Sequence, residues 1–205
     1  MKISKPRRGR PREFDRDAAL VTALDLFWRC GFEGTSIETL TNAIGISAPS
    51  LYSAFGSKEA LYRETVERYL ATYGQVFWKA FSEEPRTREA VAKLLQDAAR
   101  QFSNPGHPAG CLVSYGILQC SEHDRGLAAE MSAHRSMARE LVKTRLDAAQ
   151  TAGEVSPDTD TTALATFFSA VVQGMAVQAR DGASYEALAN IAVLAMKAWP
   201  TDERE

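Results

Sequence analysis

Apolar residues recur along this chain at intervals of three and four, the spacing that places side chains on one face of an α-helix. Between positions 15 and 30, for example, Leu20, Leu24 and Phe27 fall on one side. Alternation typical of strands is scarce, and proline and glycine separate the helical segments. The sequence therefore predicts an all-α fold of about nine helices. These are expected near 15–30, on either side of Gly45-Ile46-Ser47, and near 58–81, 87–102, 111–121, 125–152, 159–180 and 185–199.

Short polar residues mark the expected starts of the first four helices. Asp15, Ser47 and Ser57 each precede a helical segment, where a side-chain oxygen accepts a free backbone N–H. Thr35 is predicted to cap the second helix in a capping box with Glu38. The resulting run of short helices ends where the much longer helix from position 58 begins.

Two short helices joined by Gly45-Ile46-Ser47 are typical of a helix-turn-helix. The first helix of this motif braces across the DNA backbone and the second enters the major groove. On the second helix Leu51 and Phe55 are expected to face inward, which leaves small polar side chains for base edges. The outward residues are Ser47, Ser50, Tyr52 and Ser53. Each serine alone fits a cap or a solvent-facing position equally well, so the prediction depends on the arrangement.

The stretches 31–37, 45–47 and 51–61 together resemble the N-terminal signature of the TetR family of repressors, over roughly residues 13–62. The resemblance implies an all-helical homodimer whose last two helices form a four-helix bundle between subunits. It also implies a pocket among the middle helices, where an effector binds and reorients the two DNA-binding heads. Carried over by position, it implies that Ala48, Ser50 and Ser53 face bases and that Thr35, Tyr52 and Lys58 hold phosphates.

Charge is unevenly distributed along the chain. The net charge is −2, whereas residues 1–14 carry six basic side chains and one acidic one, a local +5. A cationic arm on an acidic body favours the binding of a polyanion at one end of the molecule only. Arg8-Gly9-Arg10-Pro11 resembles the core of an AT-hook, so Arg8 and Arg10 are expected to contact a minor groove or phosphates. A solvated tail is the alternative that the charge leaves open.

Composition excludes several classes of protein. No run of 18 apolar residues and no secretory signal is found, so we expect a cytoplasmic protein that does not span a membrane. The cysteines form no CxxC pair, and neither a cofactor nor a metal is expected. The chain lacks GxSxG, HExxH and a glycine-rich phosphate loop, which disfavours an enzyme. If the protein were a non-specific architectural DNA binder, its aromatic-rich body would have no function.

We expect residues 1–58 to form the DNA-binding domain and residues 59–205 an effector-binding and dimerisation domain. Aromatic side chains on the middle helices suit a small-molecule pocket, although they are also typical of a core. The predicted pocket residues are Tyr73, Phe77, Trp78, Phe102, Cys111 and Tyr115. The last two helices are apolar around more than one face, which favours a second subunit there. The predicted interface residues are Phe167, Val171, Met175, Leu188, Ile191 and Ala195.

Cys111 allows an alternative function. It follows Gly110 at the predicted start of a helix, where the dipole stabilises a thiolate. The segment 110–112 resembles one in a TetR subgroup that contains electrophile, redox and metal sensors, although cysteine is also a common buried hydrophobe. Cys120 and His123 are expected on one helix face, with His107 in the preceding loop, a generic spacing for a soft metal.

The sequence thus predicts a homodimeric transcriptional regulator, in the main hypothesis a repressor. It is expected to bind a palindromic double-stranded DNA operator and to leave it when a small-molecule effector binds. A cysteine-based redox, electrophile or metal-responsive regulator is the alternative. Nothing in the sequence identifies the effector.

Overall fold

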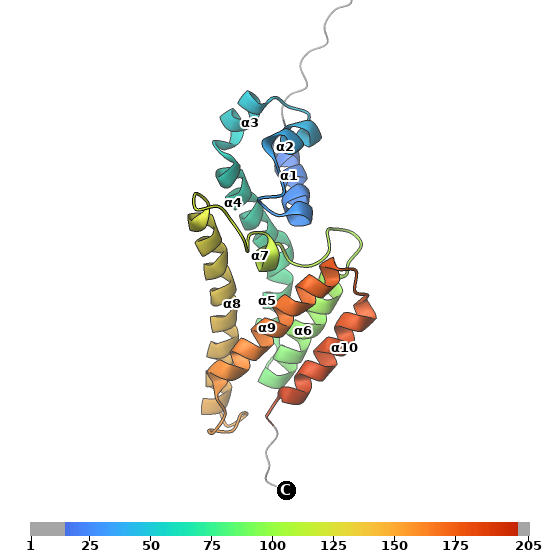
Figure 1. Ribbon diagram of the computed structural model, residues 1–205. Helices are drawn as coiled ribbons and strands as arrows, with labels where there is room; N and C mark the ends of the chain where they lie inside the picture. The colour runs from blue at the N-terminus through green and yellow to red at the C-terminus, as the bar shows by residue number, and fades with distance from the viewer. Residues whose placement is uncertain (1–14, 201–205) are drawn as a thin grey trace, which may run out of the picture.

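The computed structural model describes residues 15–200, and throughout them the chain is helical without strands, as the sequence predicts. The helices are α1 (Arg16–Cys30), α2 (Ile37–Ile44), α3 (Ala48–Phe55), α4 (Lys58–Tyr69), α5 (Gln75–Glu83), α6 (Thr87–Phe102), α7 (Leu112–Tyr115), α8 (Arg125–Thr151), α9 (Thr161–Arg180) and α10 (Tyr185–Ala195). Helices α1–α3 form a head at one end, and α5–α10 form the body (Figure 1).

One long rod joins the head to the body. Helices α4 and α5 are connected by a π-helical turn, Leu70–Gly74, so the helix predicted at 58–81 is continuous but not uniformly α-helical. The i→i+5 bonding of a π-turn is rare and is frequent at functional sites. With this rod taken as one helix, the helices of the described residues correspond one to one with those predicted.

Most of the predicted caps are confirmed. Asp15 accepts the Ala18 N–H at 3.0 Å, and Ser47 and Ser57 cap α3 and α4 in the same way. The predicted capping box at Thr35 is wrong by one residue, because Ser36 caps α2. Two adjacent hydroxyl residues offer equivalent caps, and the pattern of the sequence does not choose between them.

The helix predicted at 111–121 is the least accurate. Only Leu112–Tyr115 is helical, and the chain then turns until α8 begins. The carbonyl of Gly116 accepts the backbone N–H of Phe32 in the head at 2.8 Å, a long-range contact that no local pattern signals. Because no helix covers residues 116–124, the prediction that Cys120 and His123 share a helix face is wrong.

Residues 15–200 contain two hydrophobic cores. The body core lies among α5, α6, α8, α9 and α10. The head core is centred on Phe27, Trp28 and Leu51 but also includes Leu112 before α8 and Met131 within α8. Helix α7 lies where the head meets the body (Figure 1), and its Leu112, Val113 and Tyr115 belong to the head core.

Candidate nucleic-acid interface and ligand cavity

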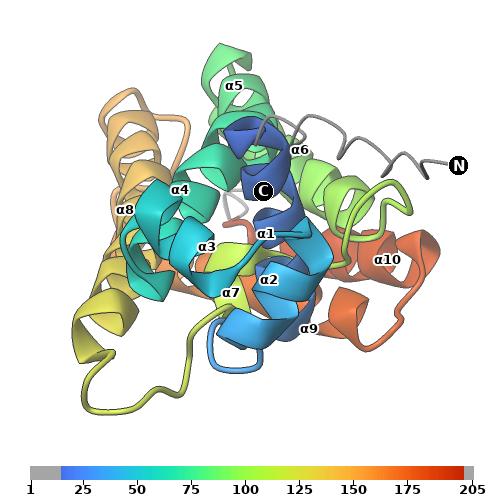
Figure 2. The ribbon, with the colours of Figure 1, turned by 90° about the horizontal axis from the view of Figure 1, so that it is seen from above.

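Helix α3 has one buried face and one polar face. Leu51 and Phe55 are only 0% and 4% exposed, as predicted, and they fix the helix on the head core. Figure 2, which looks onto this end of the molecule, shows α2 and α3 side by side. The outer face exposes Ser47, Ser50, Tyr52 and Ser53, with Ala48 partly buried beside them. The helix carries no carboxylate, so a phosphate backbone can approach without repulsion.

Arg16 on α1 holds the C-terminal end of α3 in place. Its guanidinium donates to the carbonyl of Ala54 at 3.2 Å and pairs with Glu64 on α4 at 2.7 Å. It also lies 4.5 Å from the centre of the Phe55 ring. An exposed ion pair contributes little by itself. Together these contacts join three helices and set the direction in which α3 points.

The other predicted DNA contacts have different outcomes in the structure. Thr35 is wrong as a phosphate contact, because its side chain is fully buried and its hydroxyl donates to Gly31 O at 2.7 Å. The Lys58 ammonium lies 4.0 Å from the centre of the Phe32 ring, and burial lowers its pKa. Its side chain is only partly buried, and Lys58 stays a predicted phosphate contact. Arg8 and Arg10 lie outside the described residues.

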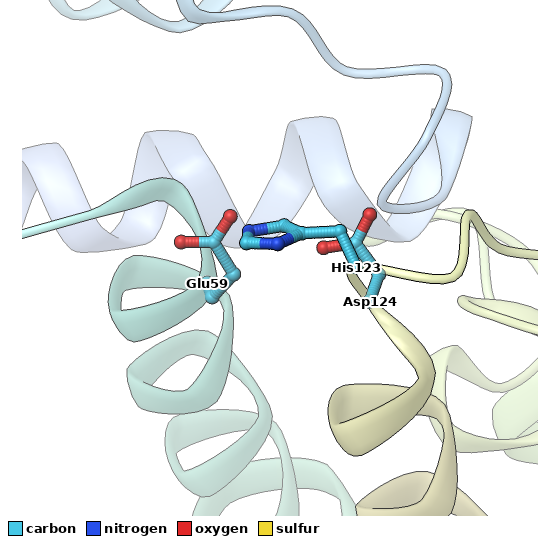
Figure 3. A group of neighbouring side chains, drawn as sticks. All are labelled: Glu59, His123 and Asp124. Carbon is cyan, nitrogen blue, oxygen red and sulfur yellow. The ribbon is translucent and has the colours of Figure 1, made fainter.

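Three side chains gather where the head meets the body. Glu59, His123 and Asp124 bring one ligand atom each to within 4.8 Å of one another (Figure 3). This donor set suits a divalent cation. Both carboxylates, however, lie at helix N-termini, where the positive dipole already stabilises them and opposes a cation. A hydrogen bond from Ser57 lowers the pKa of Glu59, and Ser121 donates to Asp124 at 2.6 Å.

A cavity of about 600 Å³ opens in the body between α5, α6, α8 and α9, next to α7. This volume falls within the usual range of small-molecule sites. Four of the six predicted pocket residues line it: Phe77, Trp78, Phe102 and Cys111. The π-turn also contributes, through Leu70 and Gly74. The cavity therefore touches both the rod and the helix that connect the body to the head.

Two predicted pocket residues are wrong. Tyr73 points toward the head, where its ring lies 4.9 Å from that of Trp28 and 5.0 Å from that of His107. Tyr115 donates to the carbonyl of Ala109, and the Arg180 guanidinium lies 4.6 Å from the centre of its ring. Both side chains thus brace the junction between head and body and do not line the cavity.

Other residues that line the cavity were not predicted from the sequence, among them Ser114, Arg135, Met137, Phe168 and Gln173. A signal existed only for Phe168, which is apolar on an apolar helix. Ser114 and Arg135 look like ordinary polar residues until α7 and α8 are placed against α5.

Cys111 lies at the cavity wall. Its backbone is extended, and α7 behind it has only four residues, so the predicted dipole effect on the thiol is weak. The Tyr69 hydroxyl is buried nearby, and burial raises the pKa of Tyr69 well above its usual range. All three cysteines are free.

Comparison with known families gives a consistent result. A family model described as bacterial regulatory proteins, tetR family, matches residues 19–65. A second, described as a tetracyclin repressor-like C-terminal domain, matches residues 87–192. The chain belongs to the tetR family. Its members are bacterial regulatory proteins.

Individual relatives of this tetR-family chain match over nearly its whole length. The HTH-type transcriptional repressor ComR of Escherichia coli (strain K12) is 36% identical over 197 residues, covering 96% of this chain and 94% of ComR. The repressor BdcR of the same strain is 30% identical, covering 94% and 93% respectively. Among solved structures, a cysteine mutant of the tetR-family regulator CifR in complex with 26-base-pair operator DNA has a TM-score of 0.88 and 40% identity, covering 94% of this chain and 100% of that one.

The last two helices of this tetR-family chain divide their apolar residues between two faces. Met175, Leu188 and Ala195 are buried in the protomer's own core, so their prediction as interface residues is wrong. Val171 and Ile191 are partly buried. Four apolar residues of these helices remain exposed, and we call them together the α9–α10 surface: Phe167, Val177, Val193 and Leu194, at 41%, 41%, 58% and 60% exposure.

Helix α9 is also long and apolar enough to cross a membrane, by length and composition alone, with a mean hydropathy of 1.3 over 18 residues. In the fold it packs against α6, α8 and α10, as a helix of a bundle does. Its hydropathy is therefore explained by a face buried in the body and a second face on the α9–α10 surface.

Proposed function

We propose that this protein is a homodimeric transcriptional repressor that leaves its DNA operator when a small molecule fills the cavity. The observation that carries the proposal is the outer face of α3, which is polar, free of carboxylates and fixed from behind by a buried core. The relatives ComR and BdcR are named repressors, and CifR was solved on operator DNA. We assign DNA binding to residues 1–58, sensing and dimerisation to residues 59–205, and place the protein in the cytoplasm with the DNA.

The α9–α10 surface supports the homodimer. An exposed apolar patch of this kind is typical of an interface. A two-fold pairing makes the same surface meet itself and holds two heads at a fixed separation. Two heads related in this way read a palindromic operator, with one α3 in each major groove.

Coupling between cavity and head has a physical route. Cys111 and Ser114 line the cavity, and two residues later Gly116 accepts a hydrogen bond from Phe32 in the head. The π-turn is a second point of coupling, because it lines the cavity and belongs to the rod that leads to the head. An effector releases DNA only if it binds the DNA-incompetent arrangement more tightly than the competent one.

The test of DNA recognition is selection of duplexes from a random pool by the full-length protein, followed by affinity measurements on the enriched sequence. We expect one palindrome. Tyr52→Ala should weaken binding about tenfold, the equivalent of one charge-assisted hydrogen bond. Tyr185→Ala is a matched control, because the two tyrosines are 45% and 46% exposed but Tyr185 lies on α10, outside the head. Equal losses in both variants, or no enriched palindrome, would reject the proposal.

The basic arm needs its own measurement. Replacing Arg8 and Arg10 with alanine should weaken operator binding and flatten its dependence on salt, because fewer counterions are released. An unchanged salt slope would show that the arm makes no DNA contact.

A thiol-responsive regulator is the second candidate, because Cys111 lines the cavity. Alkylation with iodoacetamide forms a carbon–sulfur bond at the thiolate and releases iodide. If this candidate is correct, alkylated protein loses operator affinity and alkylated Cys111→Ser protein keeps it. Equal behaviour of the two proteins would leave Cys111 as a wall residue only.

A further inference from the structure

The charges in the cavity wall are of one sign. Its lining includes the cations Lys79 and Arg135 but neither aspartate nor glutamate, although the whole chain has a net charge of −2. Lys79 belongs to the rim, since its side chain is 76% exposed and lies 3.9 Å from Glu83. Arg135 is the cation available to a ligand, because it is partly buried and has no ion pair among the described residues.

The Arg135 guanidinium is held in place but not neutralised. One nitrogen, Nη1, donates to the carbonyl of Val113 at 2.8 Å, which fixes the group beside α7. A guanidinium has five N–H donors in a planar fork, so most of them are free for a ligand. A partly desolvated cation without a counterion favours an anion that reaches it.

A second polar group lies next to the first. Ser114, the residue after Val113, also lines the cavity and is only 8% exposed. Its hydroxyl makes no hydrogen bond within the described part of the chain. The hydroxyl can therefore donate to the same anion that Arg135 attracts. The remaining walls are mostly apolar, with the aromatic rings of Phe77, Trp78, Phe102 and Phe168, although Gln75, Ser82, Ser169 and Gln173 also line the cavity.

We propose that the effector is a carboxylic acid with an aromatic or branched apolar body, and that its carboxylate binds Arg135 and Ser114. The planar fork of arginine matches a carboxylate in a bidentate geometry. The proposal rests on the proposed function, since it gives the chemical class of the molecule that fills the cavity. Binding at Ser114 contacts α7 directly, two residues before the carbonyl of Gly116 that accepts the hydrogen bond from Phe32.

The test uses two probes that share one body, 1-naphthylacetate and its uncharged analogue 1-naphthylacetamide. Their affinities for the full-length protein are measured by calorimetry without DNA. We expect the carboxylate to bind at least about tenfold more tightly, as a charge-assisted hydrogen bond implies. Arg135→Gln should abolish the preference, Arg135→Lys should keep part of it, and Lys79→Gln at the rim should leave it unchanged.

Equal affinities of the two probes for the unaltered protein would overturn the proposal, as would binding of neither at millimolar concentration. A preference that survives in Arg135→Gln would also overturn it. Even if Arg135→Gln fails to fold, the affinities of the two probes for the unaltered protein still test the proposal. Operator binding is measured separately, so a protein that binds its operator but ignores the charge of the probe refutes the effector class and leaves the proposed function standing.

Discussion

The turn after α7 offers a sharp test of how the body is joined to the head. In Gly116→Ala, the new Cβ would lie against the Tyr62 hydroxyl and 2.5 Å from the carbonyl oxygen of Leu112, well inside van der Waals contact. The φ angle of Gly116 is −59°, an ordinary right-handed value, so alanine suffers no backbone penalty there. Any loss of stability therefore comes from crowding.

The size of the loss follows from how firmly the neighbours are held. Tyr62 is fully buried, and its ring lies 5.0 Å from that of Phe27 in an edge contact, so it cannot move aside without disturbing the head core. Overpacking of this kind costs about 1–3 kcal/mol. If the backbone moves instead, the hydrogen bond between Gly116 and Phe32 is strained, and its loss costs about 1 kcal/mol.

The assay is urea unfolding at a fixed protein concentration, since a dimer's apparent stability depends on concentration. Gly126→Ala is the matched control, because its Cβ meets nothing within 4 Å on the exposed start of α8. The control should be unchanged or gain about 0.5–1 kcal/mol from helix propensity. If Gly116→Ala unfolds at the same urea concentration as the unaltered protein, the close packing of Gly116 against Tyr62 and Leu112 is refuted.

Three further outcomes are expected. Thr35→Val should lower the free energy of unfolding by about 1–2 kcal/mol, because the Gly31 carbonyl loses its buried donor. If the variant instead loses affinity for the operator without a change in stability, Thr35 is a DNA contact after all. Leu194→Glu should dissociate the dimer in sedimentation, whereas Val21→Glu, an exposed valine on α1, should not; a dimeric Leu194→Glu protein would exclude the α9–α10 surface. Burial raises the pKa of Tyr115 to about 12, so the folded state favours the protonated phenol. Its contribution to stability is therefore present below the ordinary tyrosine pKa of about 10 and is lost between about pH 10 and 12, which alkaline unfolding followed by tyrosinate absorbance would detect; ionisation of Tyr115 at its ordinary pKa in folded protein would contradict this.

Local chemistry explains what the sequence predicted well. The caps at Asp15, Ser47 and Ser57 form within three residues of the helix start, so sequence alone contains them. The inward positions of Leu51 and Phe55 follow from helical periodicity, which is strong where a short helix has one buried face.

Tertiary contacts explain what it missed. Met175 and Leu188 lie on helices that are apolar on two faces, and periodicity does not reveal which face meets the protomer's own core. The helix predicted at 111–121 stops early because Gly116 bonds to Phe32, far away in the sequence. Arg135 looks like a solvated charge on an amphipathic helix, and only the packing of α8 beside the cavity distinguishes it.

The shared core of the head limits how such regulators can be recombined. Leu112, Ile117, Leu127 and Met131 complete the interior beneath α1 and α4, yet they are encoded after the whole of α6. A chimaera spliced once at residue 58 would pair one parent's reading helices with the other parent's packing residues. Exchange of operator specificity between two such proteins therefore requires two grafted segments, the second spanning α7 and the first turns of α8.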